Sequence, residues 1–501
     1  MEEGRPENVS HAKAQRRKDE NVFAPLRLCV RFFCSVFFVL CFALFLRCGT
    51  LLLTQDELQK DPDGYWRLAE NLVEHGTFGE NDVPTAYRPP LYPLVLTGCA
   101  ALGDYGRLAV GVLHVALGAA TVGMVLVLGR LWGLGRRGAA VAALLVACDP
   151  ILLRSSAQVM TETLATFLAT AGLLALTGIL RDSVPLLGTN SAGRNPLPGH
   201  CLFQAVAHRG AKCGLLSRQM IVGIVLALAA LCRPAFLLWT LAVGTVLWWQ
   251  NYRRHSIANK DSRGPTARGE VANHRCFPWA FALGALVVLS PWAIRNQIQF
   301  GGPIVTTTHG GYTLLLANNP AFYDWLRAGA WGSVWQADQF NADWKHRRPA
   351  DEIEADRQAY AEASGAIRRE PGTFLYACIV RIGRFWCPLP HQLAADETPL
   401  GRLSRYAVAL WYLAEFALAM LGVWRICRCF RLPLSPSALR LSSAWLWGFL
   451  LVGCLLAGHV VYWTDMRMRA PVMPVVAIIA AGGLFIRDKA MIECQENRVV
   501  L

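Results

Sequence analysis

Charged residues are scarce in this 501-residue sequence. They make up 17% of the chain, against about 25% in typical soluble domains. Hydrophobic residues make up 54%, and the mean hydropathy is +0.32. This composition excludes an ordinary soluble enzyme and is typical of an all-α polytopic membrane protein. The sequence predicts about ten transmembrane helices, near 28–53, 105–130, 137–153, 160–180, 218–232, 234–250, 277–294, 405–424, 441–461 and 470–486.

The sequence also lacks a disulfide framework, a zinc pattern and an internal repeat. Most of the sixteen cysteines lie in or beside predicted spans, where a thiol packs as a small apolar group. Cys427-Arg428-Cys429 does not have the spacing of a zinc site. A lipid or sugar transporter or flippase is the alternative to an enzyme, and such proteins are commonly built from paired repeats. The missing repeat therefore disfavours transport.

Acidic residues are few in every second connection between the predicted spans. These connections are basic, as is the N-terminal tail, so the positive-inside rule places them and the N-terminus in the cytoplasm. Topology explains the net charge of +14, and no nucleic-acid partner is expected. The predicted order is a cytoplasmic tail 1–27, a membrane domain 28–294 with spans 1–7 and an outer loop 54–104, an extracytoplasmic segment 295–404 with an interfacial helix, spans 8–10 in 405–486, and a cytoplasmic tail 487–501.

The outer loop 54–104 has the opposite charge from the rest of the chain. From Asp56 to Asp104 it contains nine acidic residues and three Lys or Arg. Asp63 lies directly before a helical run, so capping of that helix is its favoured role, and a catalytic role is the alternative. Asp61 is not needed for the cap and is a candidate catalytic base.

Arg88 precedes Pro89 and Pro90, which stiffen the backbone on one side of it. A guanidinium fixed at the membrane surface is suited to bidentate binding of phosphate, although anchoring to lipid headgroups is an alternative. Glu162, at the outer start of the fourth predicted span, either complements the helix dipole or supplies a second catalytic carboxylate. Asp61 and Glu162 together could bind a divalent cation, but the sequence offers no third fixed ligand.

Four further arginines are expected at the outer face, and two of them, Arg467 and Arg469, break the positive-inside pattern there. Binding of an anion, such as the phosphate of a lipid donor, is the simplest reason for them. These residues are Arg233, Arg295, Arg467 and Arg469.

These pieces resemble a known family. Asp61-x-x-x-Tyr65 followed by Arg88-Pro89-Pro90-Leu91-Tyr92-Pro93 is similar to the first periplasmic loop of the GT-C glycosyltransferases. They also resemble the bacterial branch of the dolichyl-phosphate-mannose protein mannosyltransferase superfamily, which includes the lipid A aminoarabinose transferase. The likeness extends from about residue 50 to 486 and includes Leu231-Cys232-Arg233-Pro234, Pro291-Trp292-Ala293-Ile294-Arg295-Asn296, Gly310-Gly311-Tyr312 to Asn318-Asn319, and His459 to Arg467-x-Arg469-x-Pro471-x-x-Pro474.

The resemblance implies a GT-C-like fold in which extracytoplasmic loops form the active site. It implies an enzyme that moves a sugar from a polyprenyl phosphate to a lipid, glycan or protein acceptor at the outer face, in a bacterial cytoplasmic membrane. Asp61 would be the base or the metal-site acid, Arg88 would contact the lipid phosphate, and Glu162 would match the acid of the second outer loop. Pro62 departs from relatives that have Glu there, which leaves metal dependence open. The predicted substrate pocket consists of Tyr65, Tyr92, Tyr312, Asn318 and Asn319.

The predicted chemistry is simple. An acceptor hydroxyl needs a carboxylate to take its proton as it attacks the anomeric carbon. The leaving group is already an anionic phosphate, so it needs cations such as Arg88, Arg467 and Arg469 more than a general acid. A single displacement of this kind predicts inversion at the sugar carbon.

Overall fold

The computed structural model describes residues 36–182, 200–261, 278–329, 333–392, 397–430 and 436–486. In this part of the chain eight helices are long and apolar enough to cross a membrane. They are Val36–Leu53, Gly103–Leu131, Glu162–Ile179, Gly214–Cys232, Trp279–Phe300, Pro399–Arg428, Ala444–Val461 and Met466–Phe485. The predicted all-α polytopic class is confirmed, and the predicted tails 1–27 and 487–501 lie outside the described residues.

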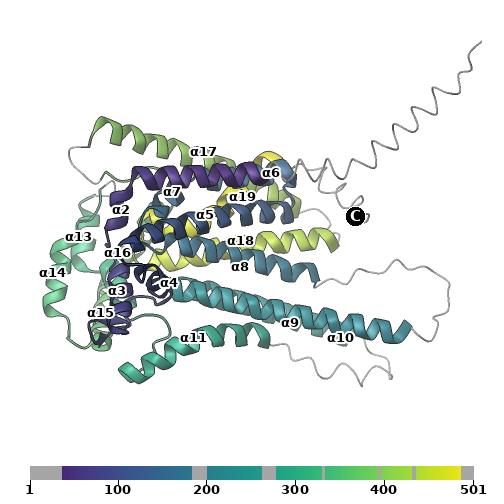
Figure 1. Ribbon diagram of the computed structural model, residues 1–501, viewed down its shortest axis with the longest axis horizontal. Helices are drawn as coiled ribbons and strands as arrows, with labels where there is room; N and C mark the ends of the chain where they lie inside the picture. Colours follow the sequence, from purple (N-terminus) through teal and green to yellow (C-terminus); the bar gives the residue numbers. More distant parts are fainter. Residues whose placement is uncertain are drawn as a thin grey trace, which may run out of the picture.

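The long helices lie side by side in one bundle (Figure 1). They are the helix Val36–Leu53, α5 (Gly106–Leu131), α6 (Gly135–Cys148), α8 (Glu162–Asp182), α9 (His200–Cys232), α10 (Phe236–Asp261), α11 (Trp279–Phe300), α17 (Pro399–Phe430), α18 (Pro436–Val461) and α19 (Met473–Phe485). α19 is the central helix of the bundle, because nearly all of its side chains are buried against α17, α6 and α5. α10 coincides with the predicted span 234–250 and packs on α9 and α18, but Trp248, Trp249 and its polar end make it less apolar than the eight.

The predicted span 137–153 is broken. α6 ends at Cys148, and α7 (Pro150–Ser156) continues at an angle of 53° to it. Pro150 has no N–H to continue the helix, and it forces the preceding residue out of the helical region. Asp149 then caps α7, because its Oδ1 accepts from the Leu152 N–H at 2.9 Å. With this pair counted as one span, the described residues hold up to nine.

The short elements gather at one end of the bundle, on the left of Figure 1. The predicted first outer loop supplies α2 (Gln55–Gln59), α3 (Tyr65–His75), the hairpin β1 (Gly79–Glu80) and β2 (Val83–Pro84), α4 (Leu91–Ala100) and η1 (Gly103–Tyr105). The second outer segment supplies α12 (Gly310–Ala317), α13 (Pro320–Arg327), α14 (Asp338–Arg347), α15 (Glu352–Arg369) and α16 (Pro371–Phe385), and η2 (Met466–Val472) precedes α19. Segments that are far apart in the sequence therefore meet at this end.

α16 covers the residues predicted to form an interfacial helix. Its exposed side carries Leu375, Ile379 and Ile382, whereas Arg381 and Arg384 are buried. Arg381 donates to the carbonyls of Val460 and Val461. An apolar outer face over buried cations is suited to contact with lipid, and the membrane position of α16 stays a prediction.

Candidate functional site

The turn Asp61-Pro62-Asp63-Gly64 carries two carboxylates, and only one of them contacts the start of α3. Asp61 accepts hydrogen bonds from the backbone N–H groups of Trp66, at 3.2 Å, and Arg67, at 3.0 Å. Asp61 therefore satisfies the first turn of α3, and the prediction that Asp63 caps this helix is wrong. Gly64 adopts a left-handed conformation (φ +72°), which side chains with a Cβ rarely adopt. This turn directs Asp63 away from the helix end.

Asp63 faces two arginines. Its Oδ1 lies 3.2 Å from Arg88 Nη2, and its Oδ2 lies 3.9 Å from Arg467 Nη1. The Asp63 side chain is about a quarter exposed, at 24%. It is therefore the acid of the turn that is both accessible and surrounded by cations.

Glu162 is the second acid in this place. It is the first residue of α8, where a carboxylate complements the positive end of the helix dipole. Its Oε1 lies 3.7 Å from Arg233 Nη1 and 3.9 Å from Arg467 Nε. Glu162 is only 2% exposed, and its Oε2 has no hydrogen-bond partner. A buried carboxylate between two guanidinium groups holds them at a fixed separation.

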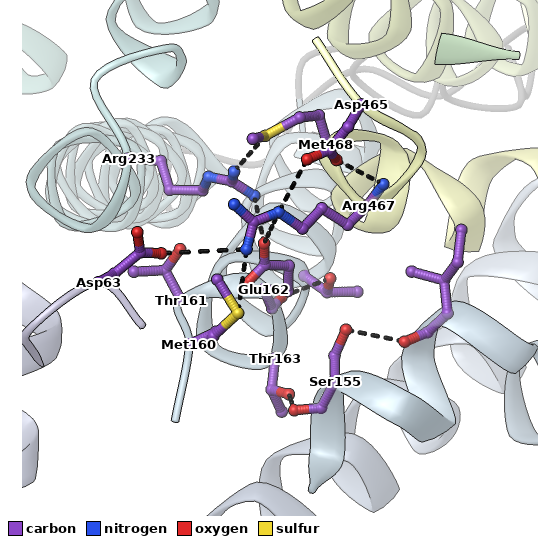
Figure 2. Close-up of polar contacts among 12 residues, drawn as sticks. Asp63, Ser155, Met160, Thr161, Glu162, Thr163, Arg233, Asp465, Arg467 and Met468 are labelled. Atoms are coloured by element: carbon purple, nitrogen blue, oxygen red, sulfur yellow. Dashed lines mark hydrogen bonds and ion pairs between the residues drawn. The ribbon is translucent and has the colours of Figure 1, made fainter. Parts of the chain in front are cut away.

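Arg467 connects the acids of the site (Figure 2). It lies on η2, and its Nε donates to Asp465 Oδ2 at 3.0 Å, in addition to its contacts with Asp63 and Glu162. We call the set Asp63, Arg88, Glu162, Arg233, Asp465 and Arg467 the arginine cluster. Asp465 was not predicted from the sequence, although its position two residues before Arg467 could have indicated it.

Two arginines of the cluster donate to thioether sulfur atoms. Arg233 Nη2 lies 2.7 Å from Met468 Sδ, and Arg467 Nη1 lies 3.0 Å from Met160 Sδ. Figure 2 shows both guanidinium groups turned toward the same space above Glu162. Sulfur is a weak acceptor, so these N–H groups would form stronger hydrogen bonds with an oxyanion than with the thioethers.

Arg88 lies between two aromatic rings. Its guanidinium carbon is 5.4 Å from the centre of the Tyr65 ring and 5.5 Å from that of Tyr87. Tyr65 also packs edge-to-face on Tyr92, whose hydroxyl lies 3.0 Å from His114 Nε2. Burial raises the pKa of Tyr65 well above its ordinary value, so this side chain remains a neutral phenol. Tyr65 and Tyr92 thus form the wall behind Arg88.

Two arginines predicted to bind phosphate lie outside the cluster. Arg295 donates to the carbonyls of Thr85, at 2.9 Å, and Phe78, at 3.0 Å. Arg469 is fully buried, donates to the carbonyl of Cys387 at 2.7 Å, and lies over the Tyr412 ring at 4.2 Å. In this conformation both residues bind protein carbonyl groups rather than face an open site.

The remaining predicted pocket residues lie on the second outer segment. Tyr312 donates to Asn341, and burial raises its pKa, while the positive charge of Arg88 opposes the shift. Asn318 is buried and accepts from Arg381 at 3.0 Å. Asn319 caps α13 by accepting from the Phe322 N–H at 2.9 Å. The two asparagines serve the local structure and do not line the cluster.

The acids of the site do not form a metal-binding set. Among the described residues, no group of three His, Cys, Asp or Glu side chains is placed to hold a metal ion. Asp61 binds the end of α3, and Glu162 faces two arginines, which repel a cation. The divalent metal suggested for Asp61 and Glu162 stays a prediction, and no step below depends on it.

No protein-family model and no curated protein matches this chain. Among solved structures it is similar to the archaeal oligosaccharyltransferase AglB from Archaeoglobus fulgidus, in complex with an inhibitory peptide and a dolichol-phosphate. The TM-score is 0.48 and the identity 14%, over 93% of this chain and 52% of that chain. It is also similar to ArnT from Cupriavidus metallidurans bound to undecaprenyl phosphate, with a TM-score of 0.34 and 15% identity, over 90% of this chain and 78% of that chain.

Both matched proteins are GT-C glycosyltransferases, the group that the loop motifs resemble. This chain spans about half the length of the AglB chain, 52%. The identities are 14% and 15%, so the matches assign no donor, acceptor or catalytic residue to this chain.

Proposed function

We propose that this protein is an integral-membrane glycosyltransferase that moves a sugar from a polyprenyl-phosphate donor to a lipid, glycan or protein acceptor. The observation that supports this most is the arginine cluster. Arg88, Arg233 and Arg467 come from three separate elements, and two of them donate to sulfur where an oxyanion would bind more strongly. A partly exposed carboxylate, Asp63, lies next to them.

The three arginines would bind the phosphate of the donor. In the structure they are matched by three acids, Asp63, Glu162 and Asp465. Glu162 is buried and keeps Arg233 and Arg467 apart, whereas Asp63 is accessible. An incoming phosphate would exchange with Asp63 at Arg88, because phosphate and carboxylate oxygens both accept charge-assisted hydrogen bonds from a guanidinium.

The exchange would release Asp63 as the base. The acceptor hydroxyl attacks the anomeric carbon, its proton passes to Asp63, and the bond from that carbon to the phosphate oxygen breaks. The electron pair leaves on the polyprenyl phosphate, whose charge the arginines stabilise. One displacement at the carbon gives inversion. Asp61, the base implied by the resemblance, has both oxygens occupied by backbone N–H groups, and its role remains a prediction.

The orientation in the membrane is part of this proposal. We expect the end that carries the arginine cluster to face the extracytoplasmic side of a bacterial cytoplasmic membrane, with the N-terminus in the cytoplasm. The supporting observation is the charge of the connections, since basic connections stay cytoplasmic.

The direct test is turnover by the purified protein in lipid nanodiscs. Polyprenyl-phosphate-linked hexoses and pentoses would be supplied with envelope glycolipids as acceptors, and release of free polyprenyl phosphate would be measured. Arg88→Ala should weaken use of the donor by about 2–4 kcal/mol, the range for loss of a desolvated charge pair. Arg357→Ala, an exposed arginine on α15, is the matched control and should behave as wild type. Donor kinetics unchanged in Arg88→Ala would show that this residue only anchors headgroups.

One observation favours transport as a second candidate. Arg47, Asp149 and Glu415 are buried within the helical bundle, and ionisable residues inside a membrane often mark transport pathways. The same nanodisc preparation separates the two functions. A flippase would move a labelled polyprenyl-phosphate sugar between leaflets without releasing polyprenyl phosphate, whereas a transferase releases it.

A further inference from the structure

The stretch that leads into Arg88 is held by a residue of the second outer segment. Glu352 is the first residue of α15 and lies 266 positions after Ala86 in the sequence. Its Oε1 accepts the Ala86 N–H at 2.9 Å, and its Oε2 accepts the Thr85 hydroxyl at 2.6 Å. One carboxylate therefore binds two consecutive residues just before Tyr87 and Arg88.

The other side of the same stretch is bound by the chain that enters α12. The Thr308 N–H donates to the Ala86 carbonyl at 3.0 Å, and the Thr307 hydroxyl donates to the Tyr87 carbonyl. The Thr308 hydroxyl in turn donates to Glu352. Both backbone groups of Ala86 are thus satisfied by the second outer segment.

Glu352 is itself held in place by its own helix. The preceding residue, Asp351, caps α15 by accepting the Glu354 N–H at 2.8 Å. A carboxylate in a first helical turn is also stabilised by the helix dipole. The position of Glu352 is therefore fixed by α15 itself and not only by its contacts with the first outer loop.

Arg88 is consequently fixed from both sides. Pro89 and Pro90 restrict the backbone after it, and the contacts of Glu352 and Thr308 restrict the backbone before it. Without Glu352, the Ala86 N–H and the Thr85 hydroxyl would lose their acceptor, and the stretch would exchange these contacts for water.

We propose that Glu352 is a positioning residue that holds Arg88 where the donor phosphate binds. This inference rests on the proposed function, since it assumes that Arg88 contacts that phosphate. Glu352 lies outside the arginine cluster and acts through the backbone of Thr85–Tyr87. It makes the donor site depend on docking of the two outer segments.

The test uses full-length protein in nanodiscs and three variants. Glu352→Ala removes the acceptor, Glu352→Gln retains one acceptor oxygen, and Glu354→Ala changes an exposed neighbour in the same helical turn. Binding of undecaprenyl phosphate and hydrogen exchange of the peptide covering 78–88 are measured, and neither requires turnover. Thermal melting of each variant reports whether it is folded.

In Glu352→Ala, exchange at Ala86 should become faster and undecaprenyl-phosphate affinity lower, each by about tenfold, the factor for one net hydrogen bond. Glu352→Gln should recover part of both losses, and Glu354→Ala should match wild type. If turnover is observed, the KM for the donor should rise in Glu352→Ala while kcat stays within about twofold, because binding rather than chemistry is affected.

A double-mutant cycle with Arg88→Ala gives the decisive outcome. When Arg88 is absent there is nothing to position, so adding Glu352→Ala should cause no further loss of lipid affinity. An equal loss in both backgrounds, or unchanged exchange at 78–88, would overturn the inference. Undecaprenyl-phosphate binding without sugar transfer would reject the proposed function, while the same cycle would still decide the role of Glu352.

Discussion

Replacing Asp63 with asparagine removes the carboxylate that faces Arg88 and Arg467 and leaves the size of the side chain unchanged. The expected fall in kcat is about 10²–10⁴-fold, the range for loss of a general base, or about 3–5 kcal/mol in the activation barrier. The donor KM should not rise, because Asp63 competes with phosphate for Arg88 at 3.2 Å. Both partners are partly exposed, so removal of their ion pair should change donor affinity by less than about fivefold.

Asp61→Asn is the paired variant. Asparagine caps a helix about as well as aspartate. Its single amide oxygen should keep one of the two contacts to the Trp66 and Arg67 N–H groups, so turnover should remain near that of wild type. The assay is single-turnover release of polyprenyl phosphate, with thermal melting to verify folding. An inactive, folded Asp61→Asn beside an active Asp63→Asn would refute this reasoning and assign the base to Asp61.

Four other outcomes are expected. Arg88→Lys should restore only part of the donor affinity lost in Arg88→Ala, because an ammonium group cannot form the bidentate contact; full recovery would contradict this. Arg469→Ala should lower the stability by about 1–3 kcal/mol, because the Cys387 carbonyl loses its donor. A folded variant that is defective only in donor binding would restore the predicted phosphate role. Burial raises the pKa of Asp356 to about 6, so the folded state keeps a proton that the unfolded chain loses near pH 4. The stability should therefore fall as the pH rises from about 4 to about 6. Thermal melts of Asp356→Asn over this pH range should lack the decrease. A lone cysteine at Asn341 should react with an impermeant maleimide from the extracytoplasmic side, and labelling only from the cytoplasmic side would invert the topology.

The class of the protein could be predicted from the sequence because membrane spans are local features. An apolar helix must satisfy its own backbone hydrogen bonds in lipid, so composition over about 20 residues is sufficient to identify it. The sequence did not reveal the break at Asp149 and Pro150, although proline is a known reason for such a break. It also did not reveal the charged residues buried in the bundle, such as Glu415, because their partners come from other helices.

The sequence identified Arg88, Glu162, Arg233 and Arg467 as members of a site, because charged residues at the outer ends of apolar spans indicate binding or catalysis. It could not distinguish Arg467 from Arg469. These residues are two positions apart on η2, a 3₁₀-helix, which advances about 120° per residue. Their side chains therefore leave the helix in different directions.

The tertiary structure also decided which acid of the first loop faces the cations. Spacing assigned the cap to Asp63, whereas in the structure Asp61 caps α3 and Asp63 faces the arginines across the left-handed turn at Gly64. Glu352 could not be identified from the sequence, because its hydrogen-bond partner Ala86 lies 266 residues earlier in the chain. Local patterns determine helices and charged ends, whereas the direction of a side chain and its distant partners depend on how the segments pack.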